Sequence, residues 1–414
     1  MNNPPDVLIL GGGVIGISAA YYLAEQGASV TVIEMGEVAS GSSYGNAGLI
    51  VPSHAVPLAA PGALADVLKW MLDPASPFYI QPRLAPDLWA WVLRFMAASR
   101  NGPMRRAIPL LRDLHLASAK LYAELASRRD LKFDYEQKGM LTAYATAQGL
   151  HHGQAEVKLL AEFGVDAQLL DSAAAHQREP ALRDHIVGGV FFPNDGHFNP
   201  SKFVQGLAEI AKKRGARIQR NTEILRIQTS GNQVKSVLTT SGTFYGKQFV
   251  LAAGAWSPRV GRDLSMNIPV QAAKGYSLTV PRPAGGPSLP LILGEARVAV
   301  TPMGDLLRFA GTLEMAGIDL SVNPRRVNAI ADAASNYLHV DRPPTTDVWR
   351  GMRPCTPDGL PILGRAKHYN NLILATGHAM IGMSLGPISG KLVSQIALGK
   401  ATEMDISALS PNRF

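Results

Sequence analysis

The stretch that decides the fold is Asp6-Val7-Leu8-Ile9-Leu10-Gly11-Gly12-Gly13-Val14-Ile15-Gly16. A short apolar run with β propensity leads into glycines spaced as G-x-G-x-x-G, and residues 17–26 then show the apolar periodicity of a helix. Gly27 ends that helix, and a second strand over 29–33 ends in Glu34. Strand, glycine turn, helix and strand in this order form the βαβ unit that binds dinucleotides.

Each part of this unit has a physical role. Gly11 permits a tight turn, Gly13 lets the backbone approach a pyrophosphate, and Gly16 lets the helix pack on the strand. The helix start offers amide donors and a positive dipole end to the phosphates. Glu34 is placed to accept hydrogen bonds from the adenosine ribose, which disfavours NADP. The unit alone does not separate NAD from FAD, and a purely structural glycine turn is the alternative.

Composition bounds the remaining possibilities. A chain of 414 residues favours two domains, and 46% hydrophobic with 17% charged residues is typical of a globular protein. No apolar run approaches the roughly 18 residues of a membrane-spanning helix. The single cysteine, Cys355, cannot form an internal disulfide, which suits the cytoplasm. The net charge of +8 is spread along the chain without a basic block interleaved with aromatics, so we expect no nucleic-acid binding.

Three later segments predict further close approaches to a cofactor. Residues 39–48 are rich in glycine and small hydroxyl side chains, as in an irregular loop that wraps a ligand. The strand 249–251 runs into Ala252-Ala253-Gly254-Ala255-Trp256-Ser257. The strand 371–375 runs into Thr376-Gly377-His378 and then into a helix with Pro387 in its first turn. The dipole of that helix is suited to a charge that develops on a flavin.

These segments occur in order with Lys274-Gly275-Tyr276-Ser277-Leu278 and with Gly351-Met352-Arg353-Pro354-Cys355-Thr356-Pro357-Asp358-Gly359. Together they resemble the FAD-dependent D-amino-acid oxidase superfamily, and within it the bacterial D-amino acid dehydrogenases, from residue 6 to about residue 400. The resemblance implies an α/β fold, with a Rossmann-type FAD-binding domain on a parallel sheet and a substrate domain on an antiparallel sheet.

The resemblance also implies a discontinuous domain organisation. Segments 1–50, 200–262 and 348–414 are expected to form the FAD-binding domain, and segments 51–199 and 263–347 the substrate domain. Alternating patterns over 140–145 and 296–301 agree with an antiparallel sheet in the second.

The expected cofactor is non-covalent FAD, because Cys355 does not occupy the position of the linking cysteine in relatives that attach flavin. The residues expected to contact the FAD are Gly11, Gly13, Val14, Ile15, Gly16, Glu34, Ser42, Ser43, Asn46, Ala47, Gly48, Gly254, Gly377, His378, Ile381 and Gly382.

The carboxylate-binding arginine of the superfamily matches Arg353, whose planar fork suits bidentate contact with a carboxylate. Pairing of Arg353 with Asp358 is the structural alternative. Arg308 is a second cation that we expect to be structural. Tyr276 either points its hydroxyl into the substrate pocket or is an ordinary sheet tyrosine.

Two histidines, His54 and His197, either line the substrate cavity or satisfy hydrogen bonds of their loops. No side chain is compelling as a general base, and the hydride mechanism of the superfamily needs none if the amine binds deprotonated. The catalytic residues expected are therefore Arg353, Tyr276 and His54, with His378 bordering the flavin.

The resemblance implies oxidation of a D-amino or D-imino acid by hydride transfer from Cα to flavin N5. Electrons would pass to a quinone or another acceptor than oxygen. Residues 45–54 and 383–387 are more similar to enzymes of cis-4-hydroxy-D-proline and D-proline. The alternatives are a broad D-alanine-type dehydrogenase, a glycine- or sarcosine-type oxidase that makes peroxide, an FAD-bearing subunit of a larger complex, and an NAD-dependent dehydrogenase.

The stretch 64–112 combines aromatic and basic residues, among them Lys69 and Trp70. A helical apolar face is expected from Leu88, Trp91, Val92, Phe95 and Met96. This stretch either packs on the sheet of the substrate domain or forms a peripheral contact with the inner face of the cytoplasmic membrane, where quinone is found.

Overall fold

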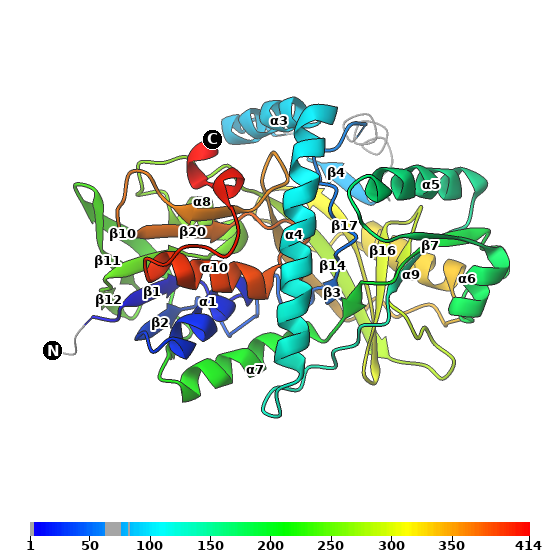
Figure 1. Ribbon diagram of the computed structural model, residues 1–414, viewed down its shortest axis with the longest axis horizontal. Helices are drawn as coiled ribbons and strands as arrows, with labels where there is room; N and C mark the ends of the chain where they lie inside the picture. Colours follow the sequence, from blue (N-terminus) through cyan, green and yellow to red (C-terminus); the bar gives the residue numbers. More distant parts are fainter. Residues whose placement is uncertain (1–3, 63–75, 82) are drawn as a thin grey trace.

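The computed structural model describes residues 4–62, 76–81 and 83–414. Within these ranges the chain forms two large sheets that lie side by side along the long axis of the molecule (Figure 1). The first sheet has six strands in the order β19-β20-β13-β1-β2-β9. All neighbours are parallel except β19 and β20. The strands are β1 (Val7–Leu10), β2 (Val30–Ile33), β9 (Arg217–Gln219), β13 (Gln248–Leu251), β19 (Ile362–Arg365) and β20 (Leu372–Thr376).

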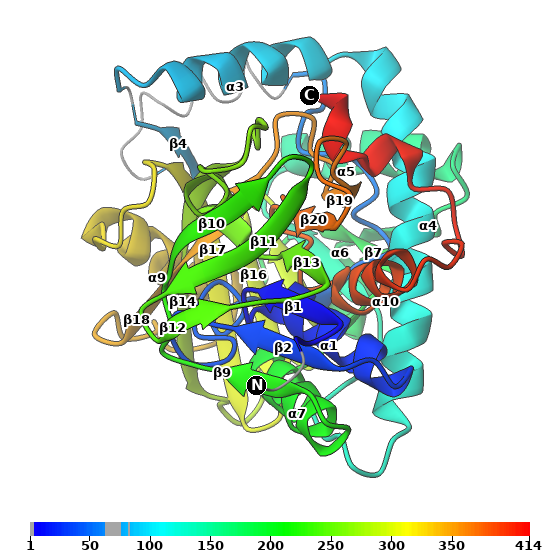
Figure 2. The ribbon, with the colours of Figure 1, turned by 90° about the vertical axis from the view of Figure 1, so that its left-hand side faces the viewer.

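Both faces of this sheet are covered, which explains the uninterrupted apolar sequence of β1. Val7 and Ile9 pack in one core with the helices α1, α7 and α10. Leu8 and Leu10 pack on the opposite face against the small sheet β10-β11-β12, which lies in front of the parallel sheet in Figure 2. The elements are α1 (Val14–Glu25), α7 (Pro200–Lys213), α10 (Gly386–Ala397), β10 (Ile224–Ser230), β11 (Gln233–Thr239) and β12 (Gly242–Phe244).

The second sheet is mainly antiparallel, with the order β18-β14-β17-β16-β15-β5-β7-β6 and β4 beside β17. Its strands are β4 (Phe78–Ile80), β5 (Met140–Tyr144), β6 (Gln168–Asp171), β7 (Gly188–Phe192), β14 (Gln271–Pro281), β15 (Leu291–Leu293), β16 (Val298–Met303), β17 (Leu306–Met315) and β18 (Val348–Cys355). Only the β15–β5 and β17–β4 pairs are parallel. The expected combination of a Rossmann-type parallel sheet and an antiparallel sheet is confirmed.

The two faces of the second sheet have different partners. The helix α9 (Pro324–Tyr337) packs on one face in a core that includes Leu278 and Phe309. On the other face, Ala299 packs with Leu49 and Val51. Leu49 belongs to the short antiparallel pair formed by β3 (Leu49–Ile50) and β8 (Gly196–His197).

The chain crosses between the sheets more than once. The strands of the parallel sheet come from the three segments expected to form the FAD-binding domain. β18 begins the last of these segments, yet it pairs with β14 and forms the edge of the second sheet. The long helix α4 (Asn101–Ala126) packs against α10, one of the helices that cover the first sheet, as Figure 1 shows. The division into two domains stays a prediction.

The helix α3 (Pro86–Ala98) lies on the outside of the molecule, at the top in Figure 2. Leu88, Trp91 and Phe95 are buried, as expected. Met96 was assigned to this apolar face, but it is 44% exposed and belongs with Trp89 and Leu93 on the outward side. The error arises because Met96 lies at the border of the face, where periodicity alone does not decide its side.

Lys69 and Trp70 lie outside the described residues. Among the residues that are described, no helix combines the length and the apolar character needed to cross a membrane.

Candidate functional site

A cavity of about 430 Å³ runs along the carboxyl ends of the parallel strands, from the start of α1 to the turn after β20. This edge of an open α/β sheet is where ligands bind in such folds. The predicted cofactor residues that line the cavity are Gly11, Gly13, Val14, Ile15, Glu34, Ser42, Ser43, Asn46, Gly254, His378 and Gly382. Five other predicted residues shape the surrounding turns without lining the cavity, namely Gly16, Ala47, Gly48, Gly377 and Ile381.

The first glycines are required by close backbone approaches. Gly11 has a φ of +121°, and a Cβ there would lie 2.4 Å from the Ala252 carbonyl oxygen. A Cβ at Gly16 would lie 1.9 Å from the Gly11 carbonyl oxygen. Gly13 differs, because a Cβ would meet only the Ser43 Oγ, at 3.5 Å. Gly11 and Gly16 therefore allow the turn itself, whereas Gly13 keeps space open beside the cavity.

The start of α1 keeps amide donors for an anion, although the Val14 amide already donates to the Ser43 Oγ at 3.0 Å. Gly13 provides no side-chain cap and the first turn holds no acidic residue. At the far end of the unit, Glu34 accepts hydrogen bonds from the amides of Gly12 (2.6 Å) and Gly36 (2.9 Å), which fix its carboxylate beside the cavity. A donor end for phosphate and an acceptor end for ribose are thus held by one βαβ unit, as a dinucleotide requires.

The other half of the cavity lies between the two sheets. The Ser42 hydroxyl donates to the Met352 carbonyl, and the Ala379 amide donates to the Pro354 carbonyl at 2.8 Å. The edge strand β18 is thereby bonded to the loop 39–48 and to the turn after β20. Gly351 and Pro354 of β18 line the cavity; their motif was expected to face the flavin, but neither residue was among the expected cofactor contacts.

His378 borders this half of the cavity, as expected. Its Nε2 is 2.9 Å from the Ser389 Oγ, and burial lowers its pKa to about 3. The imidazole is therefore neutral near pH 7. The helix α10 begins only at Gly386, and the turn residues Gly382 and Met383 stand between it and the cavity.

Arg353 is a guanidinium without an acidic partner. It lies over Gly275, where a Cβ would come within 2.0 Å of its Nη1, and it donates to the Thr312 carbonyl. Across residues 4–62, 76–81 and 83–414, no carboxylate lies within 4.0 Å of it. Asp358, the alternative partner, instead binds Arg413 at 2.7 and 3.2 Å. Arg353 is half-buried and does not itself line the cofactor cavity. A guanidinium without an acidic partner favours binding of a carboxylate from a ligand.

Tyr276 lies on the opposite face of the sheet. Its hydroxyl donates to Glu314 (3.1 Å) and accepts from the Asn323 amide (3.2 Å), within the core that α9 covers. Side chains alternate along a strand, so Tyr276 points away from the side on which Arg353 overlies Gly275. The structure does not bring Tyr276 and Arg353 together in one pocket, and its interactions are those of a buried sheet tyrosine.

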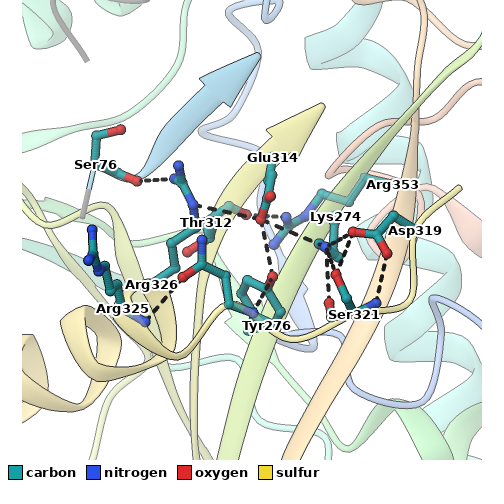
Figure 3. A network of polar contacts seen from close by, with 11 residues as sticks. Ser76, Lys274, Tyr276, Thr312, Glu314, Asp319, Ser321, Arg325, Arg326 and Arg353 are labelled. Carbon is teal, nitrogen blue, oxygen red and sulfur yellow. Dashed lines mark hydrogen bonds and ion pairs between the residues drawn. The ribbon is translucent and has the colours of Figure 1, made fainter. Parts of the chain in front are cut away.

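Figure 3 shows the polar network around Tyr276. Lys274 is buried, and its Nζ donates to Asp319 (2.6 Å) and to the Ser321 carbonyl (3.0 Å). These contacts fix the loop after β17, and Leu320 of that loop lines the cofactor cavity. The network therefore holds one wall of the cavity in place.

Arg308 is structural, in agreement with the expectation. Its Nη1 donates to the carbonyls of Tyr44 (2.9 Å) and Asn46 (2.8 Å), and its Nε donates to Thr279 (3.0 Å). It thereby ties the second sheet to the cofactor loop.

Trp349 is a residue that sequence reasoning missed. A Cβ at Gly45 or at Gly351 would lie 2.0 Å from its indole, so the ring fits between two glycines. Gly351 pairs directly with Gly275. The indole over Gly351 and the guanidinium over Gly275 therefore occupy neighbouring positions on one face of the sheet. A glycine two residues from a tryptophan in a strand was the available signal.

His54 and His197 do not line the cofactor cavity. His197 is buried in β8, and burial lowers the pKa of His54 and of His197 to about 4. Next to His54, Ser53 donates from its amide (3.1 Å) and its hydroxyl (2.5 Å) to the buried carboxyl of Asp195. Ser53 and Asp195 thus form a buried polar pair beside β3 and β8, next to His54 in the chain.

The Asp195→Asn variant is expected to gain stability relative to the wild type as the pH rises. Burial raises the pKa of Asp195 from 3.8 to about 7, so between these values the folded protein holds a proton that the unfolded chain has lost. This carboxyl therefore costs stability as the pH rises, by at most about 4 kcal/mol. Urea unfolding of both proteins at pH 4 and pH 8 measures the difference, and a constant difference would contradict the assignment.

Comparisons with known proteins agree with this geometry. The family model described as FAD dependent oxidoreductase matches residues 6–396. A D-amino acid dehydrogenase of Bradyrhizobium diazoefficiens is 34% identical, over 99% of this chain and 98% of that protein. One of Paramagnetospirillum magneticum is 35% identical, over 99% and 98%.

Among solved structures, glycine oxidase from Geobacillus kaustophilus superimposes with a TM-score of 0.81 at 24% identity, covering 100% of both chains. L-proline dehydrogenase from P. horikoshii gives 0.76 at 20% identity, covering 100% of this chain and 98% of that one. At these identities the solved structures establish a shared fold.

Proposed function

We propose that this chain, which belongs to the FAD dependent oxidoreductase family, is a dehydrogenase that oxidises a D-amino or D-imino acid. FAD is the cofactor of the family. The half of the cavity beside α1 and Glu34 fits its ADP part, and the half between the two sheets, the flavin half, fits its flavin part. The observation that carries the proposal is the unpaired guanidinium of Arg353 on the strand that lines the flavin half. Relatives named D-amino acid dehydrogenase, 34% and 35% identical over nearly the whole chain, support the same substrate class.

The residues of the chain have distinct roles in this proposal. Arg353 binds the substrate carboxylate and so orients Cα toward the flavin. FAD, when bound, supplies the acceptor for the hydride from Cα. His378 is neutral at pH 7 and is hydrogen-bonded to Ser389, which suits a boundary of the cavity better than a general base. The amine is proposed to bind in its deprotonated form, which removes the need for a base.

Non-covalent attachment of FAD is part of the proposal. The thiol of Cys355 is fully buried, does not line the cavity, and has its pKa raised to about 12 by burial. A buried neutral thiol is a poor nucleophile toward a flavin.

Cyclic substrates, cis-4-hydroxy-D-proline and D-proline, are the preferred choice. The resemblance of residues 45–54 and 383–387 supports this choice, and the indole of Trp349, held between Gly45 and Gly351, adds an apolar group next to Arg353. A broad D-alanine-type specificity is the second candidate, since the relatives carry the general name D-amino acid dehydrogenase.

A substrate screen on the purified single chain tests the function. With an artificial dye as acceptor, we expect kcat/KM for cis-4-hydroxy-D-proline and D-proline to exceed that for D-alanine by about tenfold, from the ring contact alone. D-alanine far ahead would select the broad specificity. Peroxide formed at the rate of substrate loss would indicate an oxidase. If the purified chain turned over no substrate until a partner protein was added, the chain would be a subunit of a larger complex.

A quinone in the membrane is the proposed electron acceptor, reached by peripheral contact of the protein with the inner membrane face. The outward side of α3 exposes Trp89 (53%) and Leu93 (66%), and Leu84 just before the helix is fully exposed. Arg100, just after the end of the helix, is exposed as well. Apolar side chains with flanking cations are suited to an anionic bilayer surface.

The Trp89→Ser/Leu93→Ser double variant is expected to bind vesicles about 10- to 100-fold more weakly than the wild type, because two interfacial apolar side chains are lost. Co-sedimentation with phosphatidylglycerol vesicles at low salt measures this. Leu169→Ser is the matched control, since Leu169 is 44% exposed on β6 and outside α3. Failure of the wild type to sediment would remove the membrane proposal.

A further inference from the structure

A second cavity, of about 270 Å³, lies between α3, the short helix α8 (Ser257–Val260) and the start of β14. Its lining combines an aromatic and aliphatic surface with hydrogen-bond donors: Trp91, Met266 and Ile268 with Arg94, Arg262 and Asn267. In the part of the chain that the structure describes, neither arginine forms an ion pair with a carboxylate. Asp87, the acid at this cavity, accepts from the Gln271 side chain at 2.8 Å.

This second cavity adjoins the cofactor cavity. Arg262 lines both. The indole Nε1 of Trp91 donates to the Cys355 carbonyl at 3.0 Å. Cys355 follows Pro354 and forms a β-bridge with His378, and both of these residues line the flavin half of the cofactor cavity. Trp91 therefore stands between the two cavities, in contact with the strand that borders the flavin.

The same helix connects the second cavity with the outside. Trp91 and Arg94 face the cavity, whereas Trp89 and Leu93 lie on the opposite, exposed side of α3. A ligand with a polar planar head and an apolar tail matches this arrangement, because its head fits under the helix and its tail meets the apolar side of α3.

We propose that the second cavity binds the headgroup of the quinone that reoxidises the enzyme. The planar ring packs on Trp91 and Met266, and its two carbonyl oxygens accept hydrogen bonds from Arg94, Arg262 or Asn267. The inference rests on the proposed dehydrogenase function. The amino acid loses two electrons and two protons as its C–N bond becomes C=N, and the quinone takes up two electrons and two protons as quinol.

The test fills the cavity from the helix side. Ala90 is exposed on α3 and lines the second cavity, so Ala90→Trp occupies the cavity without disturbing the core. Ala97→Trp is the matched control, since Ala97 is exposed on the same helix but outside the cavity. Asn267→Ala serves as a second variant, which removes a donor with little change of volume.

Binding of ubiquinone-1 to the holoenzyme is measured by the thermal shift and by the quenching of tryptophan fluorescence. We expect Ala90→Trp to require at least tenfold more quinone than the wild type for the same effect in both assays. Reoxidation of the flavin by ubiquinone-1 should slow by a similar factor. Anaerobic bleaching of the flavin by the amino acid, and dye turnover, should stay within twofold of the wild type. Ala97→Trp should match the wild type in every assay.

Equal quinone affinity in Ala90→Trp and the wild type would overturn the proposal, as would reoxidation by quinone without any thermal shift. If no D-amino acid bleached the flavin of the wild type, that result would instead contradict the proposed function. The thermal shift and the fluorescence titration do not depend on turnover, so the two failures are distinguishable.

Discussion

The Arg353→Lys variant is expected to lose about 100-fold in kcat/KM for its amino acid, mainly through a higher KM, since one ammonium does not reproduce the paired contact of a guanidinium with a carboxylate. The loss corresponds to about 2.7 kcal/mol, within the range for truncating one partner of a hydrogen-bonded charge pair. The structure makes the effect specific, because the guanidinium lies over Gly275 with no acid of the described chain to bind. Steady-state kinetics with dye as acceptor measures it.

The matched control for Arg353→Lys is Asp358→Asn. Asp358 lies five residues after Arg353 in the chain but binds Arg413, so neutralising Asp358 should leave KM unchanged. Flavin absorbance of each variant reports that the cofactor site is intact. Unchanged kinetics in Arg353→Lys would move the carboxylate site elsewhere.

The Gly13→Ala variant is expected to bind FAD about 100-fold more weakly while the apoprotein keeps its thermal stability. Gly13 has φ −75° and ψ −177°, which alanine adopts without strain. The new methyl group would contact only the Ser43 Oγ, so it would occupy space beside the open start of α1 where the pyrophosphate is expected. Loss of the charge-assisted amide contacts there costs about 2–3 kcal/mol.

Fluorescence titration of the apoprotein with FAD measures this change. Gly102→Ala is the control, because Gly102 lies in α4 and an added Cβ would meet only the end of the Arg106 side chain at 3.4 Å. Wild-type affinity in Gly13→Ala would place the pyrophosphate elsewhere. In the same preparations, flavin that stays with acid-precipitated wild-type protein would contradict non-covalent attachment.

The sequence predicted best what depends on neighbouring residues. The βαβ unit could be predicted because its strand, glycines, helix and Glu34 lie within 30 residues, and each has a local reason. Arg353 was identified by the resemblance of its motif, and the structure adds that Asp358 is engaged elsewhere.

Features that depend on strand register and on long-range packing could not be predicted from the sequence. Tyr276 and Gly275 are adjacent, and the register of β14 against β18 decides which of them faces Arg353. Trp349 depends on Gly45, which lies about 300 residues earlier in the chain. The burial of Asp195 against Ser53 is a contact of the same long-range kind, and no spacing rule predicts it.

The edge strand β18 connects the cofactor cavity with the proposed substrate site, so the proposed function implies that occupancy of the two sites is interdependent. The strand carries Arg353, and its carbonyls at Met352 and Pro354 are bonded to the two loops that close around the cofactor. If a bound dinucleotide orders those loops, it would also fix the position of the guanidinium. By linkage, whatever factor the cofactor adds to the affinity for the amino acid must be returned by the amino acid to the affinity for the cofactor. A shortage of either ligand would then weaken binding of the other.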